Sequence, residues 1–398
     1  MRKALSKNLF AIVAVSALFV SCSYVKKMFP GEESKPAVEV VEDVMPSQLE
    51  YIPFKSSEDS KKWGLMGLDG TVLLSDTLVS EPSNAVGGLF LMRNANGLWE
   101  YFTAEAEPKK VGGEYRSAGL FYEDVAPCVE KGKDYIQFIH KDGSVAFELK
   151  DVDGAKVDWV GRFHDGLAPF KAGHLIGYVD THGRVAIKPQ FLRAGRFSEG
   201  YALVVDTAKG NDVAFRDSAG HRVSIITVDG NLLETSFMST DSIGDRVSEG
   251  LIVSSVAPID TIPRLYKFVD PMGNTIVPEH EDYLAISNMS GTHFAFYNGT
   301  AWGIADNQAT VKLTPRYDKV VAITNVSVVA CLYGKYKFLD FSDMQISKSF
   351  DEIISLEDGS HFIGRRGEKW YMLDEIGTAM GEGVYNMVFN PGADTISR

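Results

Sequence analysis

The sequence has few cysteines, no excess of positive charge and no long hydrophobic run. Its three cysteines in 398 residues exclude a framework of disulfide bonds. Lysine and arginine total 40 against 53 aspartates and glutamates, so the net charge is −13. This balance excludes the basic surface that nucleic-acid binding requires. The chain is 45% hydrophobic and 23% charged, which is ordinary for a globular protein and excludes both wholesale disorder and a polytopic membrane protein.

The first residues have the pattern of a secretory signal. A positive start is followed by an apolar run over residues 9–20, which is too short to span a bilayer stably. Residues 19–22 (FVSC) resemble a lipobox, although Phe19 replaces the usual leucine. The resemblance implies a signal peptide over 1–21, cleavage between Ser21 and Cys22, and a lipid on Cys22. The alternative is an uncleaved anchor helix.

The next segment predicts a tether. Residues 22–50 are rich in proline and acidic residues, as expected of an extended linker behind a lipidated N-terminus. A lipid-anchored protein of this kind is expected in the bacterial cell envelope, on the outer membrane facing the periplasm, with surface exposure as the alternative. Cys128 and Cys331 each lie in a hydrophobic, strand-like run, which indicates two buried free thiols, with a disulfide between them as the alternative.

An eight-residue frame recurs nine times. Its third and fourth positions are always apolar, and its steps of 34 to 47 residues are typical of a repeat architecture. The frames begin at Trp63, Trp99, Ile136, Ile176, Val223, Tyr266, Trp302, Tyr336 and Trp370. The eighth position is glycine in six frames, at Gly70, Gly143, Gly183, Gly230, Gly273 and Gly377. A glycine that closes one strand just before the next predicts a hairpin turn with positive φ.

A second motif follows some of the frames, with weaker copies at residues 121–126 and 247–252. Residues 163–168 (FHDGLA) and 197–202 (FSEGYA) share a pattern of Phe, two residues, Gly and Ala. Together with residues 62–64 (KWG), 176–180 (IGYVD) and 189–191 (PQF), this pattern resembles the WG-repeat family, also called KWG repeats. The resemblance covers most of the chain and implies an architecture rather than an activity. A lipoprotein with such repeats is similar to envelope proteins of the Bacteroidetes.

Four short apolar runs per unit, without a helical period, predict an all-β repeat protein of antiparallel four-stranded units. Residues 51–55 and 384–389 each supply part of a unit, so the two ends are expected to complete one blade together. This favours a β-propeller of about eight blades over an open β-solenoid. The expected domain spans 51–389, and residues 390–398 form a tail. The aromatic residues at the first frame position, Trp63, Trp99, Tyr266, Trp302, Tyr336 and Trp370, are expected to pack in the core.

The chain lacks the sequence motifs of common active sites. No HExxH, Walker or GxSxG motif occurs, and the histidines are scattered about one per unit, so no catalytic residue, metal ligand or cofactor is assigned. The sequence favours a non-enzymatic binding or scaffolding protein whose partner is another envelope protein. A carbohydrate-binding or carbohydrate-active protein is the alternative, with a glycan as ligand, and a purely structural subunit is a third. The segment around Pro258 and Pro263 is the candidate binding edge.

Overall fold

The computed structural model describes residues 49–209, 221–233, 242–256, 263–391 and 396–397. The chain divides into a unit of residues 1–43 and a unit of residues 44–398, and every described residue belongs to the second. Ser21, Cys22 and most of the expected tether lie outside the described residues, as does Pro258. Within the described part, all regular structure is β-strand and every strand pair is antiparallel. No helix there is long and apolar enough to cross a membrane.

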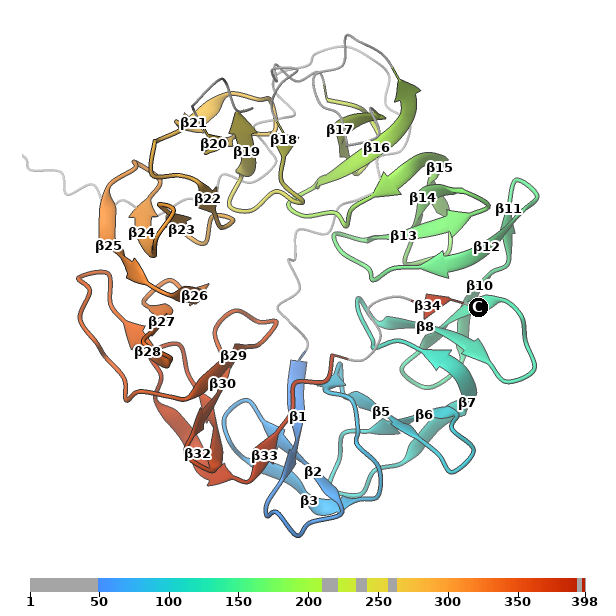
Figure 1. Ribbon diagram of the computed structural model, residues 1–398. Helices are drawn as coiled ribbons and strands as arrows, with labels where there is room; N and C mark the ends of the chain where they lie inside the picture. Colours follow the sequence, from blue (N-terminus) through green and yellow to red (C-terminus); the bar gives the residue numbers. More distant parts are fainter. Residues whose placement is uncertain (1–48, 210–220, 234–241, 257–262, 392–395, 398) are drawn as a thin grey trace, which may run out of the picture. The chain divides into compact units, whose positions relative to one another are not determined.

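The described strands form nine units of one plan, which follow one another in a ring as the blades of a β-propeller (Figure 1). Each blade is numbered here by the order of its third strand. Blades 1 to 3 contain β33 (Asn386–Met387), β1 (Leu49–Lys55), β2 (Trp63–Gly67) and β3 (Val72–Leu78); then β4 (Ala85–Val86), β5 (Leu89–Arg93), β6 (Trp99–Thr103) and β7 (Lys110–Ala118); then the end of β7, β8 (Val125–Glu130), β9 (Ile136–His140) and β10 (Val145–Leu149).

Blades 4 to 6 continue this order. They contain β11 (Asp151–Val152), β12 (Ala155–Val160), β13 (Leu167–Ala172), β14 (Leu175–Asp180) and β15 (Val185–Ala194); then the end of β15, β16 (Tyr201–Lys209), β17 (His221–Thr227) and a bridge at Leu232; then β18 (Ser242–Ile243), β19 (Ile252–Val256), β20 (Leu265–Val269) and β21 (Thr275–Val277).

Blades 7 to 9 complete the ring. They contain β22 (Ala285–Ile286), β23 (His293–Tyr297), β24 (Trp302–Asp306) and β25 (Val311–Tyr317); then β26 (Lys319–Ile323), β27 (Val328–Leu332), β28 (Lys335–Leu339) and bridges at Gln345 and Phe350; then β29 (Glu352–Ser355), β30 (Phe362–Arg366), β31 (Lys369–Leu373) and β32 (Ala379–Val384). The last strand, β34 (Ile396–Ser397), pairs with β12.

The nine sequence frames correspond to the nine third strands, so the described residues contain nine blades rather than about eight. The first described strand and β33, from the C-terminal part of the chain, share blade 1, because Met387 of β33 pairs with Phe54 of β1. The backbone N–H of Val388 adds a hydrogen bond of 3.0 Å to the Pro53 carbonyl. The prediction that the two ends complete one blade is therefore confirmed.

The turn after each third strand has a double role. The six turn glycines all have positive φ, between 77° and 85°. Gly70, in blade 1, also lies against the last strand of blade 9: a Cβ atom at this position would lie 2.1 Å from the carbonyl oxygen of Met380. Gly143 lies equally close to Gly112 of the preceding blade: a Cβ atom at position 143 would lie 2.7 Å from the Cα of Gly112. The glycine thus permits both the turn and the close approach of neighbouring blades.

The aromatic residues at the start of the third strands are less buried than expected. Trp63 is 9% exposed, whereas Trp99, Trp302 and Trp370 are only half-buried at the edge of the hydrophobic clusters. A cation from the neighbouring second strand covers several of these rings, as when the Arg93 guanidinium lies 4.5 Å from the Trp99 centroid. Such a contact stabilises an exposed ring by about 0.5–1 kcal/mol.

The two described cysteines are buried and free, as predicted. Burial raises the pKa of the Cys128 thiol to about 12, with a partly opposing hydrogen bond from Gln137. Cys128 is therefore a neutral core residue at physiological pH.

Candidate functional site

The turns between first and second strands lie on the inner side of the blades. In blades 4 to 6 each has two residues with positive φ, Asp165–Gly166, Glu199–Gly200 and Glu249–Gly250. Blade 3 has Glu123–Asp124 at the same position, also with positive φ at both residues. This is the geometry of a two-residue type I′ hairpin, which explains the glycine of the second sequence motif.

The acidic residue of each of these turns accepts hydrogen bonds from the backbone of the next blade. Glu123 accepts a hydrogen bond from the Gly166 N–H at 3.2 Å, and Asp165 accepts one from the Gly200 N–H at 2.8 Å. Glu199 accepts two at 2.6 Å, from the backbone of Glu249 and Gly250. Glu249 continues the series to Gly291 at 3.0 Å.

A serine in three of the turns makes a second connection to the next blade; Ser198 and Ser248 stand beside the acid, and Ser290 stands beside Gly291. The hydroxyl of Ser198 donates to the Val247 carbonyl, that of Ser248 to the Met289 carbonyl and that of Ser290 to the Ile323 carbonyl, each at 2.8 Å. Each carbonyl belongs to the following blade. The recurring polar residues of the second motif therefore hold neighbouring blades together, and their carboxylates are already engaged as acceptors.

The first-to-second turn of blade 9 reaches residues of blades 3 and 4. The Glu357 carboxylate accepts a hydrogen bond of 3.0 Å from the Arg162 guanidinium and lies 3.4 Å from the Tyr122 hydroxyl. Leu356, which is 3% exposed, belongs to one hydrophobic cluster with Leu120 and Phe121 of blade 3. Residues that are 195 positions apart in the chain thus form one polar contact.

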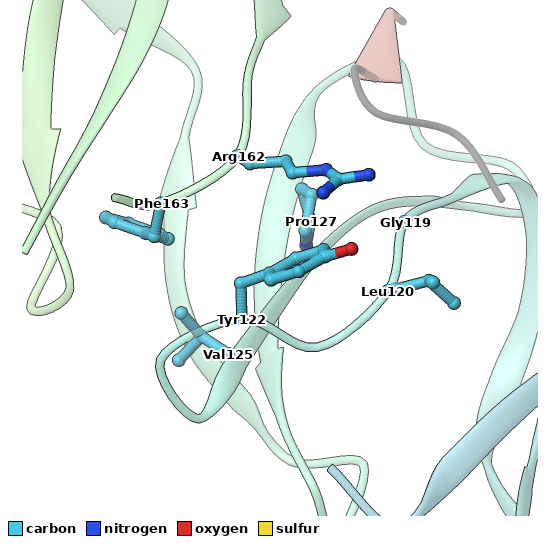
Figure 2. Close-up of a pocket in the computed structure, with 7 residues that line it drawn as sticks. All are labelled: Gly119, Leu120, Tyr122, Val125, Pro127, Arg162 and Phe163. Atoms are coloured by element: carbon cyan, nitrogen blue, oxygen red, sulfur yellow. The ribbon is translucent and has the colours of Figure 1, made fainter. Parts of the chain in front are cut away.

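Arg162 also covers an aromatic ring. Figure 2 shows its guanidinium beside the ring of Tyr122, and the two lie 4.4 Å apart, measured to the centroid. These residues line a small hollow together with Gly119, Leu120, Val125, Pro127 and Phe163. The hollow has room for about one water molecule. It is too small for an organic substrate.

Arginines occupy the same position in three successive blades. Arg162, Arg196 and Arg246 each directly precede the core residue that begins the turn motif of blades 4, 5 and 6. Arg196 is exposed as a residue, but partial removal of its guanidinium from water lowers its pKa. The nearby charges of Arg246 and Arg162 lower it further, and Asp245 and Glu357 oppose this effect. The charges of Arg162 and Arg246 therefore act on Arg196, and we call these three residues the arginine arc.

Blade 9 places a second titratable pair in its inner turn. His361 Nδ1 forms a short contact with the Asp358 carboxylate, which also accepts a hydrogen bond of 2.8 Å from the Ser360 hydroxyl. Burial alone would raise the pKa of Asp358, but the hydrogen bonds from His361 and Ser360 lower it overall. The serine hydroxyl lies on the same imidazole nitrogen as the carboxylate, at 3.3 Å, so the three side chains do not form a Ser-His-Asp relay.

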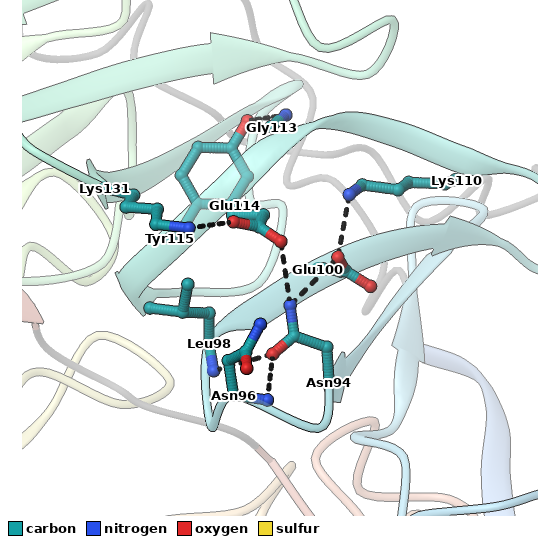
Figure 3. Close-up of polar contacts among 9 residues, drawn as sticks. All are labelled: Asn94, Asn96, Leu98, Glu100, Lys110, Gly113, Glu114, Tyr115 and Lys131. Carbon is teal, nitrogen blue, oxygen red and sulfur yellow. Dashed lines mark hydrogen bonds and ion pairs between the residues drawn. The ribbon is translucent and has the colours of Figure 1, made fainter.

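A separate polar network lies on blade 2 and is internally satisfied. Figure 3 shows Asn94 between two carboxylates, with its amide nitrogen 3.1 Å from both Glu100 and Glu114. Lys110 pairs with Glu100 and Lys131 with Glu114, both at 2.7 Å. Each carboxylate has a cation and an amide partner, so this network is a structural feature of the blade.

The sequence motifs identified the turns but not the contacts that they make. Sequence reasoning did not identify the arginine arc or the Asp358–His361 pair. The arginines could have been found, because all three directly precede the same position of the second motif. The contact between Glu357 and Arg162 has no signal in a single sequence. Pro263 is exposed at the start of the described segment after the insertion. In the described ranges, no group of three or more His, Cys, Asp or Glu side chains is arranged to hold a metal ion.

Comparison with known proteins identifies one repeat directly. Residues 176–207 match the family model of the WG containing repeat. The matched segment covers β14, β15 and most of β16, including the inner turn with Arg196, and it supports a WG-repeat family. No curated protein matches the chain.

Solved structures share the fold at low sequence identity. A eukaryotic initiation factor is similar over 85% of this chain and 97% of its own, with 12% identity and a TM-score of 0.53. The dihydro-heme d1 dehydrogenase NirN covers 91% of this chain and 78% of its own, at 10% identity and a TM-score of 0.42. Dipeptidyl peptidase 4 of Porphyromonas gingivalis is similar over 82% of this chain and 58% of its own, with 10% identity and a TM-score of 0.43. A fold shared at this level of identity assigns no activity.

Proposed function

We propose that the chain is a WG-repeat lipoprotein of the bacterial envelope, anchored by a lipid on Cys22, which binds another envelope protein without catalysing a reaction. The signal-like residues 1–21 and the lipobox-like residues 19–22 support the anchor. The acidic residues 23–50 support a tether that holds a domain away from an anionic membrane surface.

The observation that carries the binding role is the composite surface at the inner turns. Turns from blades 3, 4 and 9 are joined there through Glu357, Arg162 and Tyr122, and the arginine arc extends the surface over blades 5 and 6. The recurrent acids around it are engaged between blades. A rigid frame that presents charged side chains from separate turns suits recognition of a protein surface.

The anchor is tested by metabolic labelling with a radioactive fatty acid. We expect label and membrane association in the wild-type chain, and loss of both in the Cys22→Ala variant, which remains soluble after cell breakage. A Ser23→Ala variant is the matched control and keeps the label. Equal labelling of the Cys22→Ala variant would contradict lipidation at this residue.

The partner is tested by affinity capture from gently solubilised envelopes. The proposal expects a stoichiometric protein that is captured with the wild-type chain and reduced when Arg162 and Glu357 are both replaced by alanine. Capture of wall glycan, or turnover of wall fragments, in place of a protein would support the carbohydrate alternative.

A further inference from the structure

Blade 4 carries a strand that does not belong to the common plan of the blades. In the described part of the chain, the first strands of blades 6 to 9 are the edges of their sheets. In blade 4 the C-terminal strand β34 adds to the edge of the first strand, β12, with Ile396 opposite Val160 and Ser397 opposite Trp159. The blade plan is complete without β34, so this edge of β12 accepts an extended segment as an additional strand.

A single buried side chain anchors the described part of β34. Ile396 is fully buried in one hydrophobic cluster with Val125, Val160 and Phe163, whereas Ser397 is exposed. Gly119 lies against the same side chain, since a Cβ atom at position 119 would lie 3.5 Å from Ile396 Cγ1. Blades 3 and 4 together therefore form a socket for one branched aliphatic side chain, beside a short backbone pairing.

The chain is fixed separately before it reaches β34. The Asn84 N–H donates to the Asn390 carbonyl at 2.8 Å, and the Asn390 N–H donates to Asn84 Oδ1 at 3.0 Å. Asn84 is buried next to β4 of blade 2, and β33 pairs independently with β1. These contacts close the ring without β34. A short terminal strand with one buried side chain belongs to the least stable part of a fold, so β34 can leave β12 while the blades stay intact.

The edge that β34 occupies continues into the composite surface at the inner turns. β12 ends two residues before Arg162. Val125 and Phe163, from the cluster that contains Ile396, also line the hollow beside Arg162 (Figure 2). A segment added to β12 therefore lies next to the contact of Arg162 with Glu357. A partner segment that extends from this surface along β12 meets β34 in its path.

We propose that β34 is an intramolecular stand-in for a partner segment, and that an extended peptide with a branched aliphatic residue displaces it from β12. The backbone of β12 pairs with the incoming strand, and the isoleucine socket selects its side chain. This assignment rests on the proposed binding role and names the shape and the anchoring side chain of the partner segment. Because β34 is tethered, it competes at an effective concentration on the order of millimolar, and the wild-type chain binds a separate segment weakly.

The probe is a fluorescently labelled peptide with the sequence of residues 391–398, and its anisotropy measures binding to the full chain in detergent. The Ile396→Ser chain keeps every residue of the β12 edge but lacks the side chain that anchors β34. We expect it to bind the peptide at least tenfold more tightly than the wild-type chain does. The same peptide with Ile396→Ser is the matched control probe and is expected to bind at least tenfold more weakly. A Ser397→Ala chain, altered at the exposed residue of the strand, is expected to behave as wild type.

A second measurement uses the wild-type chain and does not depend on the folding of a variant. Hydrogen exchange of the isotope-labelled chain follows the backbone amides of residues 396–397. Excess unlabelled peptide is expected to speed their exchange several-fold, because it displaces β34, and to leave the amides of β13 unchanged. In capture from solubilised envelopes, the Ile396→Ser chain is expected to retain several-fold more of the partner than the wild-type chain.

Four results would each overturn the proposal: no binding of the peptide by the Ile396→Ser chain, equal binding by the wild-type chain, equal binding of the serine peptide, or exchange at residues 396–397 that excess peptide does not change. A wild-type dimer that is lost in the Ile396→Ser chain would assign the edge to β34 of a second copy, and would overturn it as well. Capture of no protein by either chain, together with the expected peptide binding, would contradict the proposed function alone.

Discussion

At the scale of single residues, the acidic side chains of the inner turns act mainly between blades. The carboxylates of Glu123, Asp165 and Glu199 accept hydrogen bonds from backbone N–H groups of the next blade. Arg162 is engaged by Glu357, so Arg196 and Arg246 are the arginines of this motif that we propose as contacts for a ligand. A single motif therefore supplies both the hydrogen bonds between blades and the proposed contact surface.

Replacing Glu199 with alanine is expected to lower the free energy of unfolding by about 1–2 kcal/mol. The change removes the carboxylate that accepts two backbone hydrogen bonds. Both bonds are exposed, so water partly replaces the lost carboxylate and limits the cost. Urea unfolding measures the loss. Glu58→Ala, at an exposed loop position, is the control and should change stability by less than about 0.5 kcal/mol. Equal effects of the two substitutions would contradict a stabilising role of Glu199 between blades.

Gly70→Ala is expected to cost about 3 kcal/mol, and Gly88→Ala only about 1 kcal/mol. Both glycines have positive φ, but an added Cβ at Gly70 would meet the Met380 carbonyl, whereas Gly88 has open space around it. Thermal unfolding of the two variants measures the difference. Similar melting temperatures would show that blade 1 and blade 9 are not in the close contact described.

Glu123 should make stability depend on pH. Burial raises its pKa above the usual value of 4.5, with a partly opposing hydrogen bond from Gly166. Because the folded-state pKa is raised, the neutral form is favoured in the fold, and its stabilising contribution is complete below pH 4.5 and lost as the pH rises through the folded-state pKa. Glu123→Gln stays neutral and is therefore expected to gain stability relative to wild type between pH 4 and pH 7.

The measurement is the urea midpoint of both chains at several pH values. Glu58→Gln, at an exposed position, is expected to show the same difference from wild type at every pH. A constant difference for Glu123→Gln across this range would contradict the account of its burial.

At the scale of elements, local sequence patterns predict the hairpins well, but they do not predict which distant segments pair. The frames that begin at Trp63, Ile176 and Trp302 each correspond to a third strand, because alternating apolar residues and a turn glycine specify a hairpin locally. The expectation of about eight blades treats one weak frame as a loop, whereas each of the nine frames forms a third strand. The contact of Glu357 with Arg162 depends on the whole ring and has no local signal.

The pairing of β34 with β12 offers a test at this scale. Ile396→Asp is expected to lower the free energy of unfolding by about 3 kcal/mol or more, because it places a charge in a fully buried apolar position. Its neighbour Ser397 is exposed, so Ser397→Asp is the matched control and should change stability by less than about 0.5 kcal/mol. Chemical unfolding of both variants decides the question. Two equally stable variants would mean that β34 does not pack against blade 4.

At the scale of the whole molecule, nine similar blades form a frame whose repeated residues hold it together. Specificity must then come from residues in which the blades differ. The residue directly before the inner-turn motif is one of them, since it is arginine in blades 4 to 6 but Leu120 in blade 3 and Asn288 in blade 7. Arg162, Arg196 and Arg246 are presented there by a molecule with a net charge of −13. This contrast favours an acidic partner at one inner surface over general adhesion.

The central claim is that the inner turns form the binding surface of an anchored protein. Site-specific photo-crosslinking in intact envelopes tests it most directly, with a photoreactive residue at position 196 and, as control, at position 105, which is exposed at the outer turn of blade 2. The account predicts a discrete crosslinked protein from position 196, none from position 105, and loss of the product when Arg246 is also replaced by glutamine. A product from position 105 alone would contradict the account.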